Sequence, residues 1–165
     1  SPDYSRAILA MKIMGVDPGT IRMGVAVIEG SSRMFQTPFY TTVSLNQKKR
    51  LHVRLSLIYT SIRELLDTWQ PDVLALEDIF HGASFKSAVR IGEARASVIL
   101  AATQTGIDVV EYTPARVKSA VCGSGRAAKI QVQNMIKNIL QLKELPQSDA
   151  ADALAIAVCH MHTIT

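Results

Sequence analysis

The feature that most limits the fold of this chain is the order of its apolar segments: short strand-like segments come first, and segments with helical spacing follow. Three apolar segments, at residues 12–17, 24–29 and 34–43, are separated by short turns, a pattern typical of antiparallel strands. After them the apolar residues recur at helical spacing, and strand-like segments at 72–77 and 107–112 interrupt the helices. Strands joined through helices run parallel. The sequence therefore predicts an α/β fold, with a five-stranded mixed sheet and helices on both of its faces.

The helical segments have recognisable ends. Pro71 closes the first of them, and Thr113 before Pro114 fits a capping residue followed by a proline in the first helical turn. The expected helices cover residues 46–69, 84–105, 114–121, 129–140 and 148–162.

The length of 165 residues favours one domain, which we expect to span residues 11–165. The first ten residues are expected to be an N-terminal extension or a tag remnant that is poorly ordered and lies outside the fold. Their apolar patch is too weak for a secretory signal. No apolar run approaches the ~18 residues that a membrane span needs, so no membrane association is expected.

The net charge of +4 is unevenly placed. The segment from Asp78 to Lys137 holds eight Lys or Arg residues and four Asp or Glu residues, whereas the two kinds balance in the rest of the chain. This placement indicates a basic face toward a polyanion such as a nucleic acid. An ordinary solvated surface would give the same count.

Cysteine and histidine offer little chemistry. Cys122 and Cys159 have no metal-ligand spacing, and we expect buried free thiols in a reducing cytoplasm. The four histidines form no HExxH pair, which argues against a zinc site.

Four carboxylates stand out by their position. Asp17 and Glu77 each end a predicted strand, and if those strands are neighbours, both side chains emerge at the same edge of the sheet. Asp149 and Asp152 are three residues apart on a predicted helix and share one face. Each acid alone has an ordinary explanation, as a turn residue, a solvated strand end or the first acid of a helix.

Together the four acids look like a cage for divalent metal ions. Mg²⁺ prefers carboxylate oxygens and water, and two ions about 4 Å apart can clamp a phosphodiester for in-line attack. Asp17, Gly19 and Gly24 also fit the phosphate motif that opens actin-like ATPases and sugar kinases. Those proteins need two such domains and about twice this length, so this alternative is weak.

At this point the motifs resemble a known family. Val16-Asp17-Pro18-Gly19 with Gly24, the segment LEDIF at 76–80 and the segment PQSDAADALAIA at 146–157 look like RuvC, the bacterial Holliday-junction resolvases. The resemblance runs from about residue 11 to 162. It implies an RNase H-like endodeoxyribonuclease that acts as a homodimer and makes paired symmetric nicks in a four-way DNA junction, in recombination and repair. It also implies a cytoplasmic, nucleoid-associated protein that works with the branch-migration proteins RuvA and RuvB.

The resemblance assigns roles to single residues. It makes Asp17, Glu77, Asp149 and Asp152 the catalytic metal ligands, for two Mg²⁺ or Mn²⁺ ions in each active site. Phe80 looks like the aromatic side chain that wedges against a base near the junction, although a core phenylalanine covering the end of the sheet is the alternative. Lys118 and Lys129 look like phosphate contacts.

The dimer interface is expected on the helix that starts at Ser84. Gly92 and Ala96 are small residues that let a second helix approach closely, and packing within one chain is the alternative explanation.

Two departures from the family pattern are visible. Asp78 stands where similar proteins usually have glutamine, and the loop at 81–85 lacks a basic residue that is often found there.

Two hypotheses from different classes remain: an active resolvase, and a nucleic-acid-binding module that has lost catalysis. The presence of all four acids argues for the first. The related YqgF-type RNA-processing nucleases share the motif at Asp17 but not the later two.

Overall fold

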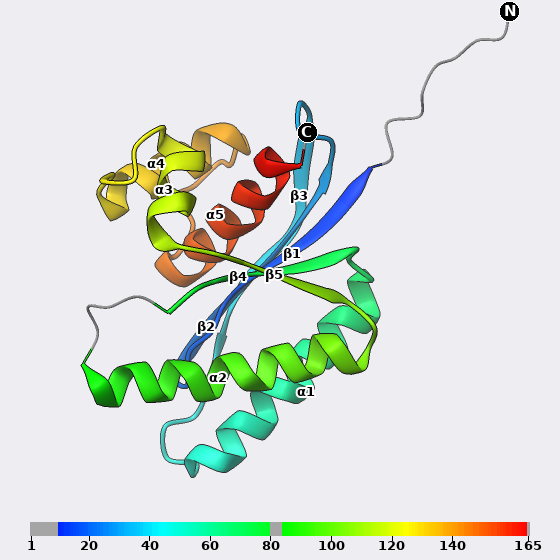
Figure 1. Cartoon of the computed structure of the whole chain (residues 1–165), viewed down its shortest axis with the longest axis vertical. Coiled ribbons are helices and arrows are strands. Elements are labelled where there is room, and N and C mark those ends of the chain that lie inside the picture. Colours follow the sequence, from blue (N-terminus) through cyan, green and yellow to red (C-terminus); the bar gives the residue numbers. More distant parts are fainter. Residues whose placement is uncertain (1–9, 80–83, 165) are drawn as a thin grey trace, which may run out of the picture.

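A computed structural model describes residues 10–79 and 84–164 and contains one five-stranded sheet. Its strand order is β3-β2-β1-β4-β5, with β1, β2 and β3 antiparallel and β4 and β5 parallel to β1 (Figure 1). The strands are β1 (Met11–Asp17), β2 (Arg22–Gly30), β3 (Phe35–Ser44), β4 (Val73–Glu77) and β5 (Asp108–Tyr112). The predicted mixed sheet is confirmed.

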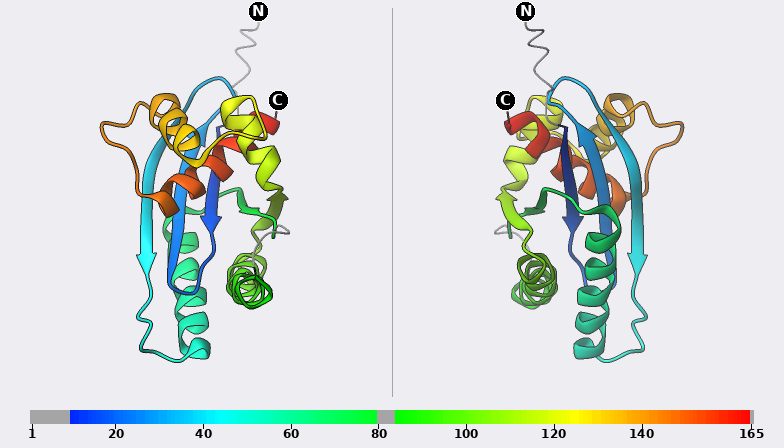
Figure 2. Two further views of the ribbon diagram at one scale, coloured as in Figure 1. Left: turned by 90° about the vertical axis from the view of Figure 1, so that its left-hand side faces the viewer. Right: turned by 90° about the vertical axis from the view of Figure 1, so that its right-hand side faces the viewer.

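Helices cover both faces of this sheet, as predicted. Helices α1 and α2 lie on one face, and α3, α4 and α5 lie on the other (Figures 1 and 2). The helices are α1 (Leu51–Trp69), α2 (Phe85–Gln104), α3 (Pro114–Cys122), α4 (Lys129–Ile139) and α5 (Ser148–Thr163).

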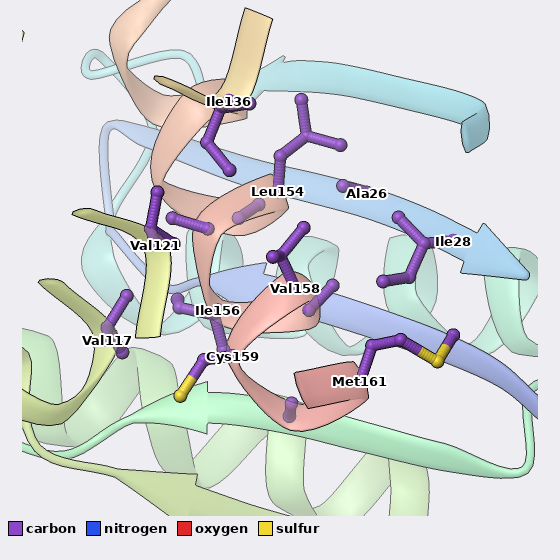
Figure 3. Packing of buried hydrophobic residues seen from close by; sticks show 14 of the residues in the cluster. Ala26, Ile28, Val117, Val121, Ile136, Leu154, Ile156, Val158, Cys159 and Met161 are labelled. Atoms are coloured by element: carbon purple, nitrogen blue, oxygen red, sulfur yellow. The ribbon is translucent and has the colours of Figure 1, made fainter. Parts of the chain in front are cut away.

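The sheet separates two hydrophobic cores. Successive side chains of a strand point to opposite faces, so Ile13 of β1 joins the core under α5 while Met14 joins the core against α1 and α2. Figure 3 shows the first of these cores, in which β2 residues Ala26 and Ile28 face Leu154 of α5. Helix α5 is buried along most of its length, which fixes it firmly on the sheet.

The start of α1 differs from the prediction. The expected helix began at residue 46, whereas α1 begins at Leu51. The Asn46 side chain accepts a 3.0 Å hydrogen bond from the Lys48 N–H, and its carbonyl accepts another from the Lys49 N–H. Asparagine competes in this way with helical hydrogen bonding, so the segment forms a separate turn before the helix.

The predicted cap at Thr113 is confirmed, and Ser84 caps the start of α2 in the same way. The hydroxyl of Ser84 accepts a hydrogen bond from the Ser87 N–H, and the hydroxyl of Thr113 accepts one from the Arg116 N–H. Each satisfies a backbone donor in the first turn of its helix. The starts of α2 and α3, which follow β4 and β5 at one edge of the sheet, are fixed by these contacts.

The two cysteines and one histidine differ in how deeply they are buried. Both cysteines are free, but only Cys159 is buried, because Cys122 at the end of α3 is partly exposed. His160 is buried against β5, where its Nδ1 lies 2.6 Å from the Tyr112 hydroxyl. Among the described residues, no helix has the length and hydropathy required to span a membrane.

Candidate active site

Two of the predicted acids leave the sheet at the same edge. β1 and β4 are parallel neighbours whose last paired residues are Val16 and Leu76. Asp17 and Glu77 each follow directly, at the carboxyl ends of adjacent strands, where open α/β sheets place their sites. The expectation that the two strands are neighbours is confirmed.

Two glycines bring the other two acids to this edge. A Cβ atom on Gly24 of β2 would collide with the backbone carbonyl of Asp149, and one on Gly15 of β1 would collide with that of Ala153. Glycine at both positions lets α5 lie directly on the strands. Gly24 is also the pairing partner of Asp17. The close approach therefore places the first turn of α5 beside the Asp17 strand end.

The side chain of Asp17 reports how close the acids are. Its pKa is raised from the ordinary value of 3.8 to about 8. Burial is the largest cause, and the negative charges of Asp152, Glu77 and Asp149 contribute the rest of the rise together with a side-chain hydrogen bond to Asp152. The same interaction between the two carboxyls lowers the pKa of Asp152. Three carboxylates from two other elements, β4 and α5, thus act on one side chain, the pattern that like charges in a shared site produce.

Glu77 and Asp152 show the same conflict between burial and neighbouring charge. Burial raises the pKa of both carboxyls. The nearby ammonium of Lys129 opposes this rise in both, and the ammonium of Lys118 opposes it for Glu77. The two lysines predicted to contact phosphate therefore lie within electrostatic reach of the acids.

Two of the acids already have cationic partners. Asp152 Oδ2 lies 3.3 Å from Lys129 Nζ, and Asp149 Oδ2 lies 3.4 Å from Arg22 Nε. Within residues 10–79 and 84–164, no three His, Cys, Asp or Glu side chains already surround one point at the spacing of a metal site. Asp149 and Asp152 therefore each face a basic side chain as well as the acidic cluster around Asp17.

Acids and lysines share one cavity. A hollow of about 210 Å³ is lined by Glu77, Asp152, Lys118 and Lys129, with apolar walls from α3, α4 and α5. Carboxylate oxygens are the donors that hard divalent cations prefer, and the donor set here contains no competing sulfur or imidazole. The residues present fit a divalent metal site flanked by two lysines.

The other predicted residues lie elsewhere or outside the described chain. Phe80 falls in the segment 80–83, which lies outside the described residues. Gly92 and Ala96 lie on α2, where Ala96 is exposed and Gly92 is partly exposed. The side chain of Asp78 accepts a 2.8 Å hydrogen bond from the Ile79 N–H in an exposed turn. The departure at this position therefore adds no fifth acid to the cluster around Asp17.

Two arginines at the site escaped the sequence analysis. Arg22 begins β2 and reaches Asp149, a contact that depends on how α5 sits on the sheet. Arg95 is buried on α2 and donates a hydrogen bond to the backbone carbonyl of Glu77. Arg95 stands three residues before Val98 and seven before Ala102, so all three lie on the buried side of the helix. A single arginine on this apolar stripe was the sequence signal that could have identified it.

Comparisons with known proteins agree with this geometry. A family model described as "Crossover junction endodeoxyribonuclease RuvC" matches residues 13–160. A RuvC from Moorella thermoacetica is 43% identical over 151 residues, covering 91% of this chain and 90% of that protein. Thermus thermophilus RuvC in complex with Holliday junction substrate superimposes with a TM-score of 0.86 at 34% identity, covering 91% and 92%. The yeast mitochondrial Holliday junction resolvase Ydc2 shares the fold, with a TM-score of 0.70 at 12% identity, covering 92% and 78%.

The family match covers the end of β1, the end of β4 and α5, which carry the four acids. Sequence identity of about 40% extends over nine tenths of the chain and of its relatives. The chain therefore belongs to the RuvC family of crossover junction endodeoxyribonucleases.

Proposed function

We propose that this chain is a structure-selective DNA endonuclease that resolves Holliday junctions by paired symmetric nicks, in recombination and DNA repair. The observation that carries the proposal is a cluster of carboxylates from β1, β4 and α5, two of which line a cavity together with Lys118 and Lys129. Acids alone would repel a DNA backbone, and lysines alone would only bind it. The combination fits metal-assisted hydrolysis of a phosphodiester.

As a member of this nuclease family the chain uses divalent metal ions. We assign Asp17, Glu77, Asp149 and Asp152 as their ligands, for two Mg²⁺ ions in each active site. The bound ions would supply an activated water and charge stabilisation for the leaving 3′ oxygen. Buried, mutually repelling carboxylates support this assignment, because a divalent cation would relieve both the burial cost and the repulsion.

Lys129 has a second task in this scheme. Its ammonium holds Asp152 at 3.3 Å, and its side chain is 62% exposed, so it can swing to a phosphate oxygen. Lys118 lines the same cavity and lies within reach of the Glu77 charge. When a metal ion takes over Asp152, Lys129 would be released to neutralise the DNA backbone. The two lysines would thereby position the scissile phosphate over the carboxylates.

The substrate contact assigned to Phe80 follows from its place in the chain. Phe80 comes three residues after Glu77 in the sequence, directly after the strand that carries this acid. Stacking of an aromatic ring on an unpaired base contributes about 1–3 kcal/mol. We propose that this residue wedges against a base at the junction centre and makes the enzyme select branched DNA.

We further propose that the active form is a homodimer built on α2. Phe85, Val89 and Leu100 are 85%, 39% and 52% exposed and continue the line of Gly92 and Ala96 along that helix. Large apolar side chains exposed at helical spacing favour a partner surface. A twofold dimer would supply the two active sites that paired nicks require.

The cellular context belongs to the same proposal. We propose that the dimer acts in the bacterial cytoplasm, at the nucleoid, on junctions that RuvA and RuvB bind and migrate. Addition of these two proteins should increase the rate of junction resolution. Equal rates with and without them would contradict this part alone.

The decisive experiment is a nicking assay on a synthetic four-way junction, with linear duplex, fork and RNA–DNA hybrid as competitors. We expect Mg²⁺-dependent paired nicks in the junction and little cutting of the others. Asp17→Asn and Asp152→Asn should each lower the rate by about a thousandfold or more, since metal ligands contribute several kcal/mol to the transition state. Both variants should still bind the junction. Binding without any cleavage by the unaltered chain would identify a binding module instead.

A further inference from the structure

A buried arginine connects α2 to the metal-binding edge. Arg95 is 7% exposed, and with His160 it is one of two buried polar residues among those described. Its Nη1 donates to the backbone carbonyl of Glu77, and its Nη2 donates to Glu111 Oε1 of β5 at 2.8 Å. A guanidinium is expensive to bury unless its donors are used. In this chain they are used on the last residue of β4 and on the neighbouring strand.

The carbonyl that Arg95 holds lies where the sheet stops supporting β4 on one side. The pairing of β4 with β1 ends at Leu76, one residue before Glu77. On the other side, the Asp78 N–H still donates to the Tyr112 carbonyl of β5. Glu77 is therefore held by β5 and by Arg95, but has no paired residue in β1. The arginine replaces a strand neighbour at the residue whose side chain must reach the metal.

We propose that Arg95 is a positioning residue, which fixes the backbone of Glu77 so that its carboxylate reaches the metal ions. This inference rests on the proposed function, in which Glu77 is a metal ligand. Groups that hold a metal ligand in place typically change metal affinity or activity by about 10- to 100-fold when they are replaced. A shift of about 1 Å at a reacting centre has a comparable effect on rate.

Glu111 orients the guanidinium. Its side chain is 43% exposed, so solvent competes with the ion pair, whereas the carbonyl end of the contact is buried with Arg95. The Glu77 carbonyl is fixed in the backbone and Glu111 is a flexible acid. Loss of the Glu111 charge should therefore disturb the site less than loss of the arginine does. Glu111→Gln keeps an acceptor oxygen for Nη2 and tests this ranking.

The experiment uses Arg95→Lys, which keeps the charge but loses the planar fork that spans two acceptors. We expect the Mn²⁺ dissociation constant, measured by calorimetry without DNA, to rise by about 10- to 100-fold. The rate constant for junction cleavage should fall by a similar factor and recover partly at high Mg²⁺. The KM for the junction should stay the same, because Arg95 does not contact DNA in this scheme. Glu111→Gln should give the same pattern with a smaller but measurable effect, of at most about tenfold.

The matched control is Arg63→Lys on α1, whose guanidinium donates to the Tyr59 hydroxyl rather than to a site residue. It should leave metal affinity and cleavage unchanged. A merely structural Arg95 would lower the melting temperature of Arg95→Lys while its metal affinity matched the unaltered chain, and that result overturns the inference. If Arg95→Lys does not fold, Glu111→Gln decides, because unchanged metal affinity in that variant also overturns it. Failure of the unaltered chain to bind Mn²⁺ or cut a junction would instead overturn the proposed function.

Discussion

Asp17 is the residue at which the demands of folding and of chemistry conflict most. Its pKa is raised from 3.8 to about 8 by burial and by three neighbouring acids. Between these pH values the folded chain keeps a proton on Asp17 that the unfolded chain has lost. Folding therefore takes up protons in this range, and the contribution of Asp17 to stability is most favourable below pH 3.8 and is lost as the pH rises through about 8.

Asp17→Asn should remove this pH dependence. In the absence of divalent metal we expect the variant to be more stable than the unaltered chain at pH 8, by on the order of 1–3 kcal/mol, because a buried charge no longer forms. At pH 4 the difference should nearly vanish. Urea unfolding in EDTA at both pH values measures this, and equal stability of the two proteins at pH 8 would contradict it.

Addition of Mg²⁺ should reverse the ranking. A cation held by the four acids stabilises only the folded state, and Asp17→Asn has lost part of its cage. The unaltered chain should therefore gain more stability from the metal than the variant does at pH 8. A gain of the same size in both proteins would remove Asp17 from the set of ligands.

Lys118 and Lys129 should each neutralise one phosphate. The logarithm of junction affinity falls by roughly 0.9 for each duplex phosphate contact as the logarithm of the salt concentration rises. Lys118→Ala and Lys129→Ala should each flatten that slope by about one unit. Lys12→Ala, at the opposite end of β1, is the control and should leave the slope unchanged. Unchanged slopes in all three would show that the lysines do not contact the backbone.

At the scale of elements, most of the fold could be predicted because local signals and tertiary packing agree. Apolar strand segments, the cap at Thr113 and the helical spacing of apolar residues give nine elements to within one or two residues. The predicted beginning of α1 was wrong because Asn46 forms a competing turn. The acids were found because they stand at element ends. The contacts of Arg22 and Arg95 were not found, because they exist only after helices and strands have packed together.

Because Gly24 has no side chain, α5 can pack directly against β2. Gly24→Ala should push α5 away from β2, since the new Cβ would meet the Asp149 carbonyl and backbone atoms cannot yield easily. We expect a loss of at least about 1–3 kcal/mol of stability, and weaker metal binding. Gly92→Ala is the control for metal affinity, because its Cβ lies away from α5 and would meet only Ile79 Cδ1 at 3.7 Å. Denaturant unfolding and Mn²⁺ titration check both variants, and a stable Gly24→Ala with normal metal affinity would contradict this placement.

The whole molecule must present two active sites to one junction. Ala96→Glu on α2 places a charge in the middle of the apolar line between Phe85 and Leu100, and we expect it to yield a monomer. The monomer should keep its metal affinity but leave only single nicks. Ser56→Glu, an exposed position on α1, adds the same charge elsewhere and should remain dimeric. Sedimentation and a nicking assay on supercoiled cruciform DNA measure both properties, and paired nicking by a chain that sediments as a monomer would refute the coupling.

The docking of α5 on Gly15 and Gly24 has a consequence for synthesis of the protein. Asp17 is synthesised long before the two acids of α5, and the glycine contacts form only when that helix arrives. A nascent or prematurely terminated chain can fold several strands and still lack half of its carboxylates. We therefore expect cleavage activity to arise only after α5 has been made and docked, so that a chain truncated before Ser148 should not cut DNA.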